Sequence, residues 1–259
     1  MFKQQGKKAI NYATGLTLYN LLLIGVYPTI SQSLEVAELA ENLPNSVKRV
    51  FGVTSGSGLD RCEAYISNQC FGRVWLLVTG IYTISTADAL IAKLVDQGAM
   101  AYLISSPVGR WEVLSTQVAV LISGLALMVG LTGLGIWGGM AFFDIRIEVW
   151  SYVRLLVLEF ALFLAVGAYS LFFSALFNEE ESTILSAASL TFLCYALEVF
   201  SELNDRFSGV KNLTIFGWVQ PQEILNGETP TLQTFGLIGL STIFILVAGY
   251  IFSKKDIHV

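Results

Sequence analysis

Side chains capable of acid–base, nucleophilic or metal chemistry are sparse in this sequence. His258 is the only histidine and stands next to the last residue, so a histidine-dependent nucleophile has no base near it in the sequence. No set of histidine, cysteine and acidic residues has the spacing of a metal site. No G-x-x-x-x-G-K-[ST] phosphate loop is present either. We therefore predict no catalytic residue, no metal site and no bound cofactor on this chain, and we do not expect it to be an enzyme.

Three acidic residues, Asp88, Glu159 and Glu198, stand within long apolar stretches. Ionisable residues inside a membrane are costly and often mark an ion pathway. Asp88 and Glu198 are near stretch ends, where we expect them to reach toward the membrane surface. Glu159 is about two turns inside its stretch, and Arg154 is its expected partner. An ion-coupled carrier that uses Asp88 and Glu159 remains an alternative function.

The stretches around these acids are long and strongly apolar. Hydrophobic residues make up 54% of the 259 residues and charged residues 14%, whereas soluble domains carry about 25% charged residues. A membrane-spanning helix needs roughly 20 apolar residues, and six blocks have this length. They cover about 10–30, 72–93, 113–141, 152–177, 183–203 and 233–252. Since none alternates apolar and polar residues as barrel strands do, we predict an all-α membrane protein with a single domain, 1–259.

Basic residues flank both ends of this six-span pattern. Short basic flanks prefer the cytoplasm, and an even number of spans places both termini on one side. The lysines concerned are Lys3, Lys7, Lys8, Lys254 and Lys255. We therefore expect a multi-pass protein of the cell membrane with both termini cytoplasmic, and with residues 31–70 and 204–232 facing outward. The net charge of −5 without a long basic run gives no sign of nucleic acid binding.

The second block carries hydroxyl groups along one helical face. They belong to Thr79, Tyr82, Thr83 and Thr86, at the i, i+3, i+4, i+7 spacing. We predict that this face lines a transport path, where it would offer amphipathic cargo a weakly polar surface. The alternative is that these hydroxyls bond to their own helix backbone.

The connection between the second and third blocks is neither a membrane span nor an ordinary loop. Met100, Leu103 and Ile104 recur at helical spacing, which predicts a short amphipathic helix. Ser106 is expected to cap the next helix, with Pro107 at its first position. The short helix either rests on lipid or docks through its apolar residues in a groove of a cytosolic partner. The pattern alone leaves both open.

The sequence DQGAMAYLISSPVGR in this connection resembles the signature of the type-2 ABC exporter permeases. Their signature has an acidic residue, Gly-Thr, a Leu-Leu pair and Pro-x-Ser-Arg. The matching positions are Asp96, Gly98, Leu103, Ile104, Pro107 and Arg110. Ala99 and Gly109 depart from it, where threonine and serine are usual.

Three further segments resemble parts of these permeases, in the same order. They are YPTISQSLEVAELAENLPNSVKRVFG after the first block, FGWVQPQEILNG before the sixth, and the FSKKDIHV ending. The resemblance implies a cytoplasmic coupling helix between spans two and three and outer amphipathic and re-entrant segments.

The same resemblance implies partners and a function. The chain would pair with a second copy of itself or a homologous permease, and with a cytosolic ABC ATPase subunit that holds ATP and Mg. It would serve as the membrane-spanning subunit of an exporter of amphipathic peptides or hydrophobic drugs. The docking residues it implies are Asp96, Gly98, Leu103, Ile104, Pro107 and Arg110, and the amphipathic pattern adds Met100 to them. A non-transporting accessory or immunity protein is a further alternative.

Two features remain open at this level. Gly135 and Gly139 form a G-x-x-x-G pattern in the third block, which permits close helix approach either within the chain or at a dimer seam. Cys62 and Cys70 share an outer segment. If that segment is helical, their Cα atoms are roughly 12 Å apart, which is beyond the reach of a disulfide.

Overall fold

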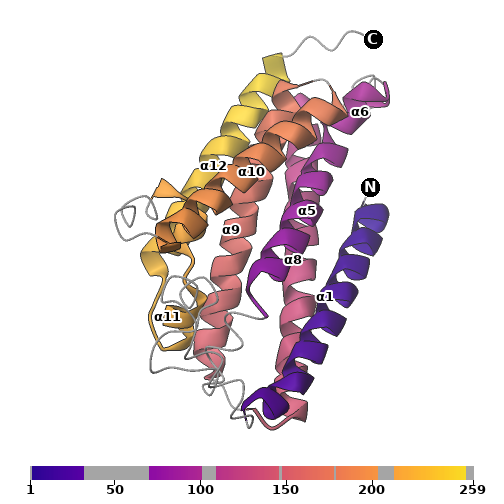
Figure 1. Ribbon diagram of the computed structural model, residues 1–259. Coiled ribbons are helices and arrows are strands. Elements are labelled where there is room, and N and C mark those ends of the chain that lie inside the picture. Colours follow the sequence, from indigo (N-terminus) through magenta and orange to yellow (C-terminus); the bar gives the residue numbers. More distant parts are fainter. Residues whose placement is uncertain are drawn as a thin grey trace.

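The computed structural model describes residues 2–31, 70–100, 109–145, 148–177, 179–203 and 213–254. Within these ranges every regular element is helical (Figure 1). The long helices are α1 (Phe2–Ser31), α5 (Arg73–Leu90), α8 (Arg110–Phe142), α9 (Val149–Leu176), α10 (Glu180–Leu203) and α12 (Thr231–Lys254). Shorter elements are α6 (Ala92–Asp96), η2 (Phe216–Trp218) and α11 (Pro221–Leu225).

Six of the segments are long and apolar enough to cross a membrane, which confirms the predicted six-helix architecture. The second of them joins α5 and α6, from Val74 to Asp96. At 1.5 Å per residue, the 33-residue α8 is about 50 Å long, well beyond a 30 Å hydrocarbon core, so it must tilt or project. The chain is therefore built as a multi-pass membrane protein.

Helix α9 is the centre of the bundle. It packs against α5, α8, α10, α11 and α12, and every residue from Ala161 to Leu171 is buried. A helix that is apolar all round is expected to be buried rather than amphipathic. The sequence of α9 shows this pattern, with a charged residue, Glu159, on its buried part.

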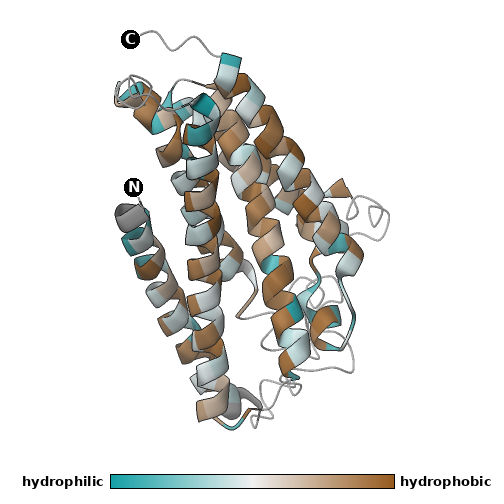
Figure 2. Ribbon diagram, turned by 180° about the vertical axis from the view of Figure 1, so that it is seen from behind, coloured by the Kyte–Doolittle hydropathy of each residue, from teal (hydrophilic) through white to brown (hydrophobic). Residues whose placement is uncertain are grey.

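Helices α1, α10 and α12 carry exposed apolar side chains. Figure 2 shows that hydrophobic residues extend along the long helices of the bundle. The exposed fractions are 72% for Leu22, 72% for Phe192 and 69% for Phe235. Apolar surface on this scale would be unusual on a soluble monomer, and it suits contact with lipid or with another membrane chain.

The glycine motif of α8 lies against α1 of the same chain. A Cβ atom on Gly139 would come within 2.7 Å of Leu21 Cδ2, and one on Gly135 would collide with the side chain of Thr17. Such distances leave no room for a side chain, so both glycines allow the two helices to approach closely. This contact accounts for the motif by packing within one chain.

The second span is interrupted where it leaves the bundle. Helix α5 ends at Leu90, and Ile91 takes a non-helical conformation with φ −129° and ψ −68°. The backbone N–H of Ala92 then donates to Ser174 Oγ of α9 at 2.8 Å, which satisfies the first donor of α6. Helix α6 ends at Asp96, and Gly98 follows in a left-handed conformation with φ +68°. The break at Ile91 was not predicted.

The start of α8 differs from the sequence expectation. Its N-cap residue is Gly109, in an extended conformation, and the Gly109 N–H donates to Glu112 Oε2 at 3.2 Å. In a capping box, the side chain of a glutamate three residues after the N-cap accepts from the N-cap backbone N–H, as Glu112 does here. The helix therefore begins at Arg110, and Pro107 is not in its first turn. Ser106 and Pro107 themselves lie outside the described residues.

Candidate functional site

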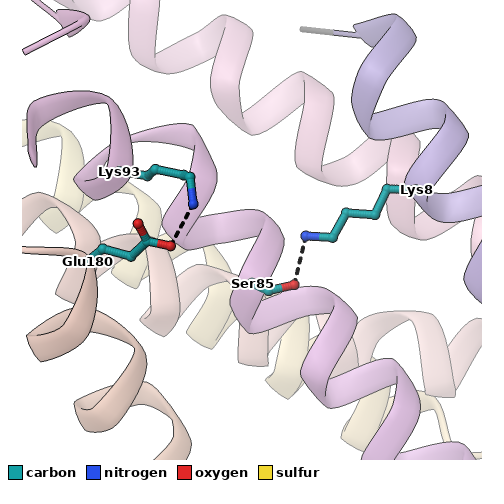
Figure 3. A network of polar contacts seen from close by, with 4 residues as sticks. All are labelled: Lys8, Ser85, Lys93 and Glu180. Atoms are coloured by element: carbon teal, nitrogen blue, oxygen red, sulfur yellow. Dashed lines mark hydrogen bonds and ion pairs between the residues drawn. The ribbon is translucent and has the colours of Figure 1, made fainter. Parts of the chain in front are cut away.

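One end of the bundle gathers the start of α1, the end of α5, α6, the starts of α8 and α10 and the end of α12 (Figure 1). We call it the termini end. Lys8 Nζ of α1 donates to Ser85 Oγ of α5 at 2.8 Å. Lys93 Nζ of α6 forms an ion pair with Glu180 Oε1 of α10 at 2.7 Å (Figure 3). Two lysines thus tie the second span to a neighbouring helix on either side.

Asp88 lies between these two contacts and is only 2% exposed. Lys8 and Lys93 are close enough for their positive charges to act on it, and the negative charges of Glu180 and Asp96 oppose them. The expectation that Asp88 reaches the membrane surface is wrong for this structure. The carboxyl is instead enclosed in a mixed-charge cluster one turn before the break at Ile91.

The predicted docking segment is described only at its two flanks. Asp96 and Gly98 are exposed at the termini end, where a partner could reach them. Met100 is 0% exposed and belongs to the core of the chain, so a partner would not reach its side chain without rearrangement. Leu103, Ile104 and Pro107 lie outside the described residues, and so does the rest of the predicted coupling helix.

Arg110 lies at the other flank of this segment, at the start of α8. Its Nη1 donates to the backbone carbonyls of Ser253 at 3.1 Å and Phe252 at 3.4 Å. The last carbonyls of a helix have no partner within it, so Arg110 satisfies two of them at the end of α12. The ring of Trp111 lies directly over Gly249, where a side chain would collide with it. These contacts hold the start of α8 against the end of α12.

The four hydroxyl-bearing residues of α5 are fully buried inside the chain. Thr83 Oγ1 donates to the Thr79 carbonyl at 2.7 Å, as the backbone-bonding alternative requires. Thr83 also packs toward Gly167 of α9, and the Tyr82 hydroxyl lies over Gly124 of α8. Tyr82 and Thr83 thus pack against α8 and α9, and Thr79 and Thr86 are buried on the same face of α5. Their role in moving cargo stays a prediction.

The hydrogen-bond partner of Glu159 differs from the one predicted from the sequence. Trp75 Nε1 of α5 donates to Glu159 Oε2 at 3.2 Å, whereas the expected partner, Arg154, lies over the ring of Trp150 at 5.7 Å. The contact joins residues 84 positions apart. The one signal in the sequence is Trp75 itself, near the start of the second span, because a buried indole N–H usually needs a hydrogen-bond acceptor.

Helices α5 and α9 contact each other in one register, in which Trp75 meets Glu159 and Thr83 meets Gly167. Beyond the break at Ile91, Ala92 at the start of α6 meets Ser174 of the same helix α9. The two helices therefore run in the same direction, with polar contacts near both ends of the interface. Any shift of α5 along α9 would break several of these contacts together.

The sequence matches no protein-family model and no curated protein. Among the residues that the structure describes, no group of three or more His, Cys, Asp or Glu side chains is placed to hold a metal ion. The functional assignment therefore rests on the geometry of the termini end and on the sequence patterns that converge there.

Proposed function

We propose that this chain is the membrane-spanning subunit of an ATP-driven exporter, and that a separate cytosolic ATPase binds it at the termini end. The observation that carries the proposal is how the segment between Asp96 and Arg110 is held. Both flanks of this segment are fixed to other helices, and its first residues are exposed. A partner bound there would hold several spans at once.

The two flanks reach different parts of the bundle. On one side, α6 is joined to α9 by the Ala92–Ser174 hydrogen bond and to α10 by the Lys93–Glu180 ion pair. On the other side, Arg110 joins the start of α8 to the end of α12. A force on the segment would therefore be transmitted to α5, α8, α9, α10 and α12. This is what a subunit that turns a partner's ATP hydrolysis into helix motion needs.

The energy source and partners follow from the same proposal. The sequence has no phosphate-binding loop, so ATP and Mg would be held by the partner subunit. The resemblance of residues 96–110 to the type-2 ABC exporter permeases supports an ABC ATPase as that partner, and a second copy or a homologous permease as the other half. Amphipathic peptides or hydrophobic drugs are the proposed cargo.

The proposed orientation places the termini end in the cytoplasm of a cell whose membrane holds the chain. It is supported by the lysines in the first turns of α1 and at the end of α12. The ATPase is cytosolic, so the exposed flank at Asp96 must face the same side as both termini. A non-transporting accessory protein would have no need for such a partner.

Purification from native membranes tests the proposal. A tagged chain extracted in mild detergent is expected to bring down a soluble ATPase, and Asp96→Arg is expected to lower its recovery at least several-fold by reversing an exposed docking charge. Glu228→Arg is the matched control, because Glu228 is an exposed acid just before α12, at the opposite end. If no ATPase is recovered with the wild-type chain, the proposal fails. Equal losses from both variants would remove the docking role of Asp96.

A further inference from the structure

Glu159 is enclosed in the bundle, and none of the residues that the structure describes places a compensating positive charge beside it. Its side chain is 0% exposed on the central helix α9. One oxygen, Oε2, accepts the neutral indole N–H of Trp75. The other, Oε1, has no hydrogen-bond partner among the described residues. Arg154, the nearest basic residue on the same helix, lies over the ring of Trp150.

The surrounding helices add a negative charge rather than a positive one. The Tyr169 hydroxyl of α9 and the Thr191 hydroxyl of α10 share a hydrogen bond. Because α9 and α10 run in opposite directions, Glu198 lies near the level of Glu159, close enough for its charge to act on that carboxyl. Trp75 of α5 contributes a neutral donor, and no charged side chain of α8, α11 or α12 in the described part acts on this carboxyl. Tyr152 is a neighbouring titratable residue on the same helix, and its hydroxyl donates to the Gly133 carbonyl at 2.7 Å.

An ionised Glu159 would be very unfavourable in this setting. Burying a charged carboxylate costs several kcal/mol even after the protein relaxes, roughly the energy of several hydrogen bonds. One neutral donor offsets only a part of that cost. Two nearby carboxylates also repel each other, so a site of this kind favours a single negative charge at most.

We propose that Glu159 and Glu198 form a proton-binding site between α9 and α10, in which Glu159 holds one proton and Glu198 is ionised. The proton neutralises the buried carboxyl and leaves Oε2 free to accept from Trp75. Glu198 is partly exposed whereas Glu159 is fully enclosed, so Glu198 is the member of the pair that carries a charge at the lower desolvation cost. The site does not depend on the exporter proposal.

The site also connects two helices of unequal burial. Helix α10 contacts α9 and α5, but most of its surface is turned outward, whereas α9 is enclosed. A movement of α10 would carry Glu198 away from Glu159 and change the electrostatic surroundings of the proton. Proton binding and the position of α10 are therefore linked.

Infrared spectroscopy of the full chain in lipid vesicles tests the proposal near neutral pH. The wild-type spectrum minus that of Glu159→Gln is expected to show the loss of one protonated carboxylic acid, with no loss of carboxylate. Glutamine keeps an acceptor for Trp75, so the fold is retained. The wild-type spectrum minus that of Glu198→Gln is expected to show the reverse: one carboxylate is lost and the carboxylic acid is retained.

Loss of a carboxylate band on Glu159→Gln would overturn the proposal, since Glu159 would then be ionised. Loss of the carboxylic acid on Glu198→Gln would also overturn it, because the proton would belong to the other residue. Glutamate labelled with 13C at the side-chain carboxyl provides a second readout on the unaltered chain, which does not depend on the folding of any variant. At least one protonated glutamate is expected by NMR, and none would refute the site.

Discussion

Gly139→Leu is expected to separate α1 from α8 and to lower the free energy of unfolding by about 1–3 kcal/mol, the usual cost of overpacking. The Cβ of any larger residue would lie 2.7 Å from Leu21 Cδ2 and 3.2 Å from Ile24 Cδ1. The Ile24 side chain cannot withdraw far, because it is fully buried. Thermal unfolding followed by circular dichroism in detergent measures the effect.

Gly138→Leu is the matched control for this experiment. Gly138 precedes Gly139 on the same helix, yet no heavy atom lies within 4 Å of where its Cβ would stand. Removing a glycine from a helix interior is favourable by itself, by roughly 0.5–1 kcal/mol. Gly138→Leu should therefore unfold at or above the wild-type temperature. If the two variants behave alike, the glycine motif does not hold α1 against α8.

Met100→Asp is expected to prevent the chain from folding rather than merely to uncouple it from a partner. The Met100 side chain is 0% exposed, and a buried charge without a partner costs several kcal/mol, a large part of the stability of a typical domain. Yield in the membrane and the elution profile in detergent provide the measurement. Met100→Leu, a swap of similar volume, should cost less than about 1.5 kcal/mol.

The opposite outcome would also be informative. If Met100→Asp folds as well as Met100→Leu but no longer recovers the ATPase, the side chain must turn outward to meet the partner. The sequence-based assignment of Met100 to the docking face would then be correct, and its burial in the isolated chain would describe an unbound state.

Sequence alone was sufficient to predict the spans. Lipid requires a continuous apolar length, so the third span, expected at 113–141, appears as Arg110–Phe142. The fifth, expected at 183–203, appears as Glu180–Leu203. The helices extend past the apolar blocks because backbone hydrogen bonding continues into polar residues. For this reason α1 begins at Phe2, before the lysines that hydropathy placed outside the first span.

Contacts between distant helices were not visible in the pattern of single residues. Periodicity identified the hydroxyl face of α5, but it did not show that α8 and α9 cover this face. Arg154 is close to Glu159 in sequence, whereas Trp75 is 84 residues away and is the actual donor. At the break at Ile91, the backbone N–H of Ala92 donates to Ser174 Oγ, which belongs to another helix, α9. Each of these features is fixed by the packing of the whole bundle.

The central claim is that an ATPase binds at the exposed flank of the segment between α6 and α8. A photoreactive amino acid placed at Gln97, an exposed residue after Asp96, tests it most directly, with the same group at Glu228 as the control at the opposite end. Illumination of intact membranes, followed by mass spectrometry, is predicted to join position 97 to a soluble protein that carries a phosphate-binding loop and hydrolyses ATP. Position 228 is predicted to give no such product. The same ATPase joined equally at both positions, or at neither, would contradict the account.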